Sequence, residues 1–211
     1  MGDSIERLEW RYAVKKFDSE AYLAEEQLEK LVKAFNLTAT SYGLQPIRLV
    51  VLKNKEMQAA LVPFSYKQQQ VAQASHVLVI CIETNIDRDY ITKYFERVKQ
   101  VRGTAEQILS PFKDALVDSF SKKEIEEVRQ WATNQAYLAM GNLLTVCALE
   151  HIDACPMEGF IPAAYDEHLG LGPIGLSSVL VLPIGKRAQD DFFAEMKKVR
   201  RDLSESIIRI Y

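Results

Sequence analysis

The sequence predicts an α+β fold of three layers, in which helices cover both faces of a mixed β-sheet. Helical and strand patterns alternate along all 211 residues without internal repeats or low-complexity linkers, which indicates one domain over residues 1–211. Three apolar runs rich in β-branched residues have the length of strands, at 47–52, 77–82 and 178–184. A long apolar helical segment lies between the second run and the third.

Two helices precede the first strand. Asp3 and Glu6 form a capping-box-like pair, so the first helix is expected to begin there. The second helix is amphipathic, because apolar residues recur at helical spacing at Leu28, Leu31, Val32 and Phe35. A polar loop over 38–46 then leads into the strand at 47–52.

Short helices over 55–61 and 68–74 separate the first strand from the second. The run at 77–82 is wholly apolar, so we expect it to be buried on both faces of the sheet. A short helix over 162–169, closed by a glycine, precedes the third strand. The tail at 207–211 has strand composition, and a free terminal strand can pair with the sheet edge of a neighbour.

Residues 87–130 form a more polar helical excursion, which Gly103 interrupts. Within it, Ser110 followed by Pro111 is typical of a helix start. Ser121 with Glu124 predicts a capping box for the next helix.

That next helix runs to about Glu150 and is apolar around most of its surface. One face carries Trp131, Gln135, Leu138, Asn142, Leu143 and Val146. The other faces carry Tyr137, Met140, Leu144, Cys147 and Ala148. Such a helix must be buried on all sides, and a second subunit is the simplest cover in a chain of this size. A central helix inside one monomer is the alternative.

Composition excludes several classes of function. The net charge of −3 argues against bulk nucleic-acid binding, and no apolar run approaches the roughly 20 residues of a membrane span. The first residues lack the apolar segment of a secretory signal. Cys81, Cys147 and Cys155 lie in apolar runs, which suggests buried, reduced thiols. We therefore expect a cytoplasmic protein without a membrane or nucleic-acid partner.

Three segments far apart in the sequence carry the functional signal: residues 11–18, 153–160 and 197–201. In this order they resemble the nitroreductase family of FMN-dependent NAD(P)H oxidoreductases. The resemblance covers nearly the whole chain, since further matches occur at 40–46, 74–77 and 180–185. It implies a homodimer with a mainly antiparallel sheet, in which each C-terminal strand is exchanged onto the partner.

The resemblance also assigns cofactor contacts. FMN ends in a phosphate with a charge of about −1.5 to −2, which requires fixed cations. Arg11, Lys198 and Arg200 match the positions that hold this phosphate, although a solvated charge run near the terminus is the other interpretation of 197–201. Lys15 matches the lysine near the N1/C2=O edge, where a cation stabilises reduced flavin. Gln70 matches a polar contact to the pyrimidine.

The sequence departs from the family pattern at several of these positions. Lys67 stands where relatives carry Asn, so it either loses the ring contact or adds a second cation. Tyr12 and Ala13 replace His-Ser or Arg-Ser, which leaves only a backbone N–H at Ala13. Gly43 replaces an Asn in a loop that contacts FMN near the dimer interface. The other predicted contacts of this loop are Thr40, Ser41 and Gln45.

The segment Pro156, Met157, Glu158 and Gly159 matches the family residues that lie against the flavin. Backbone N–H groups around Glu158 and Gly159 would reach N5 and O4. We expect Glu158 to position the cofactor, while a general acid and an exposed loop acid are the alternatives. Candidate walls of the substrate site are Tyr42, which could equally be a loop aromatic packed on the core, together with Phe112 and Phe120.

Other polar groups carry less signal. His76, His151 and His168 lack the spacing of a catalytic triad or a metal site, so each is interpreted as structural and no metal is expected. The glycine string at 170–175 is no dinucleotide-binding fingerprint, because no strand precedes it and Pro173 follows the second glycine. NADH or NADPH would therefore have to visit the open flavin face.

The function implied by the resemblance is a ping-pong oxidoreductase. Hydride would pass from NAD(P)H to flavin N5 and then to a nitroaromatic, a quinone or a similar small oxidant, under a lid formed by 87–130. A pteridine or enone reductase of the same family is one alternative. A flavin-binding protein without turnover and a cofactor-free interaction protein are the others.

Overall fold

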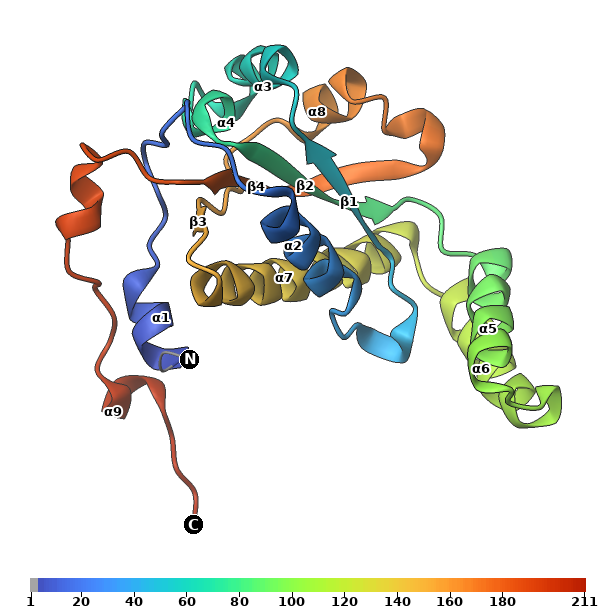
Figure 1. Ribbon diagram of the computed structural model, residues 1–211. Coiled ribbons are helices and arrows are strands. Elements are labelled where there is room, and N and C mark those ends of the chain that lie inside the picture. Colours follow the sequence, from blue (N-terminus) through green and yellow to red (C-terminus); the bar gives the residue numbers. More distant parts are fainter. Residues whose placement is uncertain (1–3) are drawn as a thin grey trace.

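The computed structural model describes residues 4–211, and a four-stranded sheet lies at its centre between two layers of helices (Figure 1). The strand order is β1-β2-β4-β3, and the neighbouring strands pair antiparallel. A parallel bridge also joins Ala13 to Ala154 of β3. The predicted three-layer α+β fold with a mainly antiparallel sheet is thereby confirmed.

The strands follow the apolar runs of the sequence. The bounds are Ile47–Leu52 for β1, His76–Glu83 for β2, Asp153–Ala154 for β3 and Leu176–Gly185 for β4. β2 is central and buried on both faces, as predicted. Its side chains alternate between two cores, because successive residues of a strand point to opposite faces. Leu78, Ile80 and Ile82 belong to one core, and Val77, Val79 and Cys81 belong to the other.

Different helices cover the two faces (Figure 1). One layer contains α1 (Ser4–Trp10), α2 (Glu25–Asn36) and the long α7 (Ile125–Leu149). The opposite layer contains α3 (Lys55–Leu61), α4 (Gln70–Gln73) and α8 (Pro162–His168). Short 3₁₀ turns occur at Ser41–Gly43, Pro63–Ser65, Gly172–Ile174 and Phe192–Glu195. The predicted start of the first helix at Asp3 lies outside the described residues.

The excursion consists of α5 (Arg88–Arg102) and α6 (Glu106–Ser121), which project from the body as a pair (Figure 1). Gly103 ends α5 in a left-handed conformation, as its position predicted. The prediction of a helix start at Ser110 was wrong, because α6 continues through Pro111. Ser110 Oγ instead donates to the Glu106 carbonyl one turn earlier, so it acts inside the helix.

The predicted capping box at Ser121 was also wrong. Ser121 is the last residue of α6, and its Oγ donates to the Asp118 carbonyl. Glu124 occupies the N-cap of α7 instead, and its N–H donates to the Glu127 carboxylate at 2.9 Å. The sequence thus contains two overlapping capping-box patterns, Ser121 with Glu124 and Glu124 with Glu127. Only the second pair forms the cap.

α7 is only partly enclosed by its own chain. Ala132, Ala136 and Leu143 are fully buried, whereas Tyr137 and Leu138 are 46% and 54% exposed. The helix therefore leaves an apolar face uncovered, which is the feature on which the dimer prediction depends. The dimer itself stays a prediction.

The C-terminal segment leaves the body and carries the short helix α9 (Leu203–Ser206) (Figure 1). Residues 207–211 form no strand with their own sheet, and their apolar side chains are exposed. The exchanged strand also stays a prediction. Cys81, Cys147 and Cys155 are buried and free, as expected. Among residues 4–211 there is no helix long and apolar enough to span a membrane.

Candidate functional site

A largely buried ion pair between Asp153 and Arg187 fixes the segment after α1 to the edge of the sheet. The Asp153 carboxylate of β3 accepts hydrogen bonds from the Arg187 backbone N–H and Nε, both at 2.8 Å. The terminal nitrogen Nη2 of Arg187 lies 2.6 Å from Asp153 Oδ1 as an ion-pair contact. The Arg187 guanidinium also lies 4.4 Å from the ring centroid of Trp10 and 4.6 Å from that of Tyr12. These contacts place residues 10–12 beside β3 and the end of β4.

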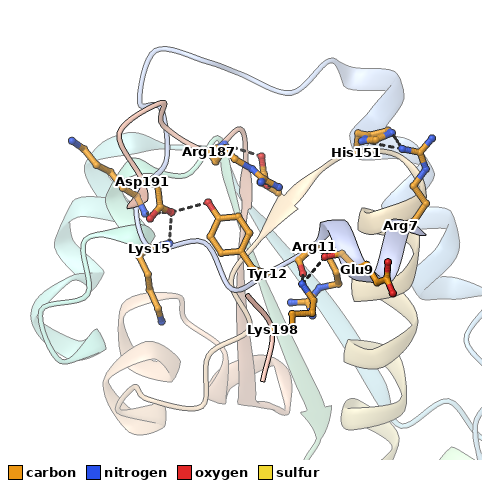
Figure 2. A network of polar contacts seen from close by, with 11 residues as sticks. Arg7, Glu9, Arg11, Tyr12, Lys15, His151, Arg187, Asp191 and Lys198 are labelled. Atoms are coloured by element: carbon orange, nitrogen blue, oxygen red, sulfur yellow. Dashed lines mark hydrogen bonds and ion pairs between the residues drawn. The ribbon is translucent and has the colours of Figure 1, made fainter. Parts of the chain in front are cut away.

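Asp191 fixes the next residues of this segment (Figure 2). Its Oδ2 accepts from the Tyr12 hydroxyl at 2.9 Å, the Lys15 N–H at 2.9 Å and the Lys16 N–H at 3.2 Å. Burial alone would raise the pKa of Asp191, but these hydrogen bonds outweigh it and lower the pKa. Burial and the bond to Asp191 raise the pKa of Tyr12. The Tyr12 side chain is therefore part of the scaffold, and the Lys15 side chain stays free to reach outward.

Three cations from opposite ends of the chain converge at the end of α1. Lys198 Nζ donates to the carbonyls of Glu9, at 2.8 Å, and Arg11 (Figure 2). Burial and then the charge of Arg200 lower the pKa of Arg11, and burial followed by Arg11 and Arg200 lowers that of Lys198. Within the described chain, no carboxylate forms a salt bridge with any of these three cations. The cluster therefore has the chemistry of an anion site.

The segment 153–159 leads from this cation cluster to a cavity. The Cys155 N–H donates to the Pro183 carbonyl at 3.0 Å, and Met157 pairs with Val181 in both directions. Burial raises the pKa of Cys155, while the nearby charges of Lys15 and Arg11 oppose that rise. Extended backbone covers about 13 Å between Ala154, beside the cations, and Glu158. The cation cluster and the cavity therefore lie at opposite ends of one short backbone segment.

Gly159 is tied to the turn that carries Lys67. Gln68 Nε2 donates to the carbonyls of Gly159, at 2.9 Å, and Ser65, at 3.1 Å. A Cβ on Gly159 would lie 3.2 Å from the same Nε2, so the glycine permits this close approach. Tyr66 and Lys67 both have positive φ, 50° and 62°. The structure thus brings Lys67 beside Gly159 with its side chain exposed, while Gln70 is buried at the start of α4.

Glu158 and Tyr137 contact each other in the lining of a cavity of about 390 Å³. The Tyr137 hydroxyl donates to Glu158 Oε1 at 2.8 Å, and this bond raises the pKa of Tyr137. The other lining residues are Met140, Pro156, Met157 and Leu180. Sequence analysis assigned Tyr137 only to a face of the long helix and did not predict its hydrogen bond to Glu158. A polar aromatic residue on the exposed face of an apolar helix was the available signal.

The loop 40–45 is held elsewhere, against the first half of α7. The Ser41 N–H donates to Gln135 Oε1 at 2.8 Å, and Thr40 Oγ1 accepts from the Gln45 N–H at 3.0 Å. The opposite end of α7 contacts α1, where the ring centroids of Trp10 and His151 are 4.9 Å apart. About 21 Å of helix separates Gln135 from the end of α7. Within one chain, the structure therefore does not bring Thr40, Ser41, Gly43 and Gln45 to the cation cluster.

The backbone conformation and surroundings of Gly43 explain why a glycine stands where the family pattern has Asn. It has a φ of +74°, and a Cβ placed there would lie 2.3 Å from the hydroxyl oxygen of Tyr94. Neither the backbone nor the space admits a larger side chain without rearrangement. Tyr94 of α5 thus occupies the position that an Asn side chain would need.

The three aromatic candidates differ in exposure. Tyr42 is about half exposed and stacks on Trp131 with the ring centroids 6.1 Å apart. Phe120 is buried against the rings of Tyr42 and Trp131, so it is a core residue of this chain. It does not line the cavity that contains Glu158. It lines instead a larger cavity of about 440 Å³ at the root of α5 and α6, which contains none of the predicted cofactor contacts. Phe112 is about half exposed on α6.

The histidines have structural surroundings. His76 is buried, its Nδ1 lies 2.9 Å from Ser75 Oγ, and burial lowers its pKa. His151 contacts Arg7 and Trp10, and His168 packs on Phe64. The described residues contain no cluster of three or more His, Cys, Asp or Glu side chains suited to a metal ion.

Comparison with known proteins decides the family. A sequence model of the Nitroreductase family matches residues 8–186. The chain belongs to the nitroreductase family. The oxygen-insensitive NAD(P)H nitroreductase of Salmonella typhimurium is 27% identical over 95% of this chain and 96% of its own length. The prediction of an oxidoreductase is thereby confirmed at the level of the family.

Solved structures of the same fold agree. A nitroreductase-like protein from Streptococcus mutans superposes with a TM-score of 0.84 at 25% identity, covering 98% of each chain. A protein of this fold from Exiguobacterium sibiricum, solved in complex with FMN, has a TM-score of 0.82 at 19% identity and covers 100% of this chain and 98% of its own. This last similarity supports the fold.

Proposed function

We propose that this nitroreductase family member binds FMN and transfers hydride from NADH or NADPH to small oxidants such as nitroaromatics and quinones. One observation carries the proposal. Arg11, Lys198 and Arg200 converge at one end of segment 153–159, and in the described chain none of them forms a salt bridge with a carboxylate. A cavity lined mainly by apolar side chains opens at the other end of the segment. The ends of this segment suit the phosphate and the ring of one flavin nucleotide.

The cation cluster would hold the FMN phosphate. A phosphate monoester carries about −1.5 to −2 charges at neutral pH. Burial is the largest cause of the lowered pKa values of Arg11 and Lys198, and repulsion among Arg11, Lys198 and Arg200 adds to it. Phosphate binding would relieve that repulsion. The two guanidinium groups can each donate two parallel hydrogen bonds to phosphate oxygens, and the Lys198 ammonium adds a point charge.

The flavin ring would lie between Lys15 and the segment Pro156 to Gly159. Met157 is locked to β4, so the backbone N–H groups near Glu158 and Gly159 are preorganised as donors. Lys67 and Gln70 would contact the ring from the turn that Gln68 ties to Gly159. When bound, FMN would supply two-electron chemistry, taking hydride from the nicotinamide and giving it to the oxidant. Both partners would use one open face in turn, which gives a ping-pong cycle.

The active unit would be a homodimer. The loop 40–45 is held at Gln135, about 21 Å along α7 from the end that contacts α1, so a second copy packed on the exposed face of α7 would supply this loop. Tyr137 and Leu138 lie on that face. The exposed residues 207–211 would pair with the partner's sheet, and β1 offers a free edge because, within residues 4–211, it pairs only with β2.

Helices α5 and α6 would form the lid. They project from the body (Figure 1), and α6 carries the half-exposed Phe112. Tyr42 and Phe112 are the candidate walls of the substrate site, with Phe120 supporting Tyr42 from the core.

Flavin absorbance tests the proposal. The purified protein should show the absorbance bands of bound FMN at one per chain. Anaerobic NADH or NADPH should bleach them, and a nitroaromatic or quinone should restore them. Colourless protein that takes up no FMN would refute cofactor binding. Yellow protein that neither nucleotide bleaches would show a flavin-binding protein without this activity.

A further inference from the structure

The larger cavity, of about 440 Å³, lies where α5 begins and where α6 is followed by α7. The buried side chains in its lining are all apolar: Ile82, Ile86, Val117 and Phe120. None of its lining residues belongs to the cation cluster or lines the cavity of Glu158. A cavity of this size can hold a small molecule of its own.

The cavity lies on the side of α7 that faces away from the surface proposed for the dimer. α7 contributes Val128 and Arg129 to its lining. Val128 precedes Tyr137, and Arg129 precedes Leu138, by nine residues, which is about two and a half helical turns. The members of each pair therefore lie on opposite sides of α7. A second copy packed on Tyr137 and Leu138 does not pack on the side of α7 that lines the cavity.

Three cations contribute to the exposed part of the lining. Arg88 is the first residue of α5, Lys123 lies in the turn between α6 and α7, and Arg129 lies in the second turn of α7. Within residues 4–211, none of the three forms a salt bridge with a carboxylate. Their charges are therefore available to an anion.

The two carboxylates in the lining already have partners. Arg48 Nε donates to Glu83 Oε1 at 2.7 Å, and the Glu83 side chain is 14% exposed. The Asp87 carboxylate caps α5 and accepts from the Tyr90 N–H at 2.9 Å and from Asn85 Nδ2 at 2.7 Å. The lining still carries one positive charge more than it carries negative charges, because it contains three cations and two carboxylates.

We propose that this cavity binds a small apolar carboxylate, with its hydrocarbon part against the buried side chains and its anionic group among Arg88, Lys123 and Arg129. The inference goes beyond the proposed function and does not rest on it. Burial of the hydrocarbon supplies most of the affinity. An anion without an apolar part would gain only exposed ion pairs, which contribute little. The cations make the site prefer an anion over a neutral molecule of the same shape.

Octanoate and its neutral analogue octanamide test the inference, by isothermal titration calorimetry on the purified full chain at low ionic strength and near neutral pH. Octanoate should bind with a dissociation constant of roughly 1 mM or lower. Octanamide should bind at least about fivefold more weakly. Added salt should weaken the binding of octanoate and leave that of octanamide unchanged.

Substitutions in the lining locate the site. Arg88→Gln, Lys123→Gln and Arg129→Gln should each weaken octanoate binding by roughly two- to fivefold, the effect of one exposed charge, and leave octanamide binding unchanged. Arg102→Gln is the matched control, since Arg102 is exposed at the other end of α5 and does not line the cavity. It should leave the binding of both ligands unchanged. Val128→Phe, which enlarges a side chain of the lining, should weaken both.

Equal affinities for octanoate and octanamide would overturn the inference, as would the absence of octanoate binding up to about 10 mM. Octanoate binding that is unchanged when all three cations are replaced together would place the carboxylate at another site, and would equally contradict it. If Val128→Phe does not fold, the three glutamine variants decide, because the replaced side chains are exposed and form no salt bridge in the described chain.

Discussion

The guanidinium of Arg187 binds the carboxylate of Asp153 through contacts of 2.6 and 2.8 Å while it lies between two aromatic rings. The Asp153 side chain is 8% exposed and that of Arg187 is 23% exposed. One pair thus joins β3, the end of β4 and the segment that carries Arg11. The position of the cation cluster depends on this ion pair.

Asp153→Ala should therefore destabilise the protein strongly. Removal of one partner leaves a buried charge uncompensated, which costs about 3 to 5 kcal/mol. Urea unfolding followed by circular dichroism measures the loss. Asp118→Ala is the matched control, since its exposed pair with Lys122 contributes below about 1 kcal/mol. Similar losses for the two variants would contradict the structural role of Arg187.

The stabilisation by Asp191 should depend on pH. Its folded-state pKa is lowered, so its contribution is complete above the ordinary value of 3.8 and declines as pH falls through the folded value. Asp191→Asn should cost about 1 to 3 kcal/mol at pH 7, and the difference from wild type should shrink below pH 4. Urea titrations at several pH values measure it.

Asp190→Asn provides the control for Asp191, because its carboxylate is exposed and its partner Lys16 is about half exposed. That variant should leave the free energy of unfolding nearly unchanged. A constant effect of Asp191→Asn from pH 7 to pH 3 would show that its hydrogen bonds do not favour the ionised form.

Gly43→Ala should lower stability more than Gly103→Ala. Both glycines have positive φ, +74° and +65°, so both alanines carry a similar backbone strain of about 1 to 2 kcal/mol. Only at Gly43 would the new Cβ meet another atom, the Tyr94 hydroxyl at 2.3 Å, whereas nothing lies within 4 Å at Gly103. Thermal unfolding of the two variants measures the difference.

Replacement of Tyr94 by Ala should recover part of the loss in Gly43→Ala and none of the loss in Gly103→Ala. Equal destabilisation of the two single variants would mean that Tyr94 does not determine the residue at position 43.

Leu138→Glu should weaken the proposed dimer. A carboxylate on the exposed apolar face of α7 would be desolvated without a partner, so the dimer dissociation constant should rise by at least about tenfold. FMN content should fall with it, because the partner is expected to supply the loop 40–45. Sedimentation velocity and flavin absorbance measure the two effects.

Ile174→Glu is the control for Leu138, since Ile174 is exposed near α8 on the opposite face of the sheet. It should leave both measurements unchanged. A Leu138→Glu protein that remains dimeric and fully loaded would place the interface elsewhere.

Local patterns predicted the strands and most helices well, because β2 and β4 are simply the most apolar runs in the chain. The local patterns predicted the wrong helix starts at Ser110 and Ser121. Both serines match a cap motif in sequence, but they lie inside α6 and hydrogen-bond to carbonyls of their own helix. The pairing of Tyr137 with Glu158 was not predictable, since those residues meet only when α7 packs beside β4. Convergence of Arg11 with Arg200 was anticipated from the family resemblance, which spans both ends of the chain.

The relative affinity for FMN and riboflavin tests the central claim most directly, because the two molecules differ only in the phosphate. Fluorescence titration of apoprotein should show FMN binding tighter than riboflavin by roughly 100-fold, as expected for charge-assisted hydrogen bonds. Arg11→Ala and Arg200→Ala should each reduce this ratio by about tenfold, while the exposed neighbour Arg201→Ala should not. Equal affinity of the wild type for both flavins would contradict the claim that Arg11, Lys198 and Arg200 bind the phosphate.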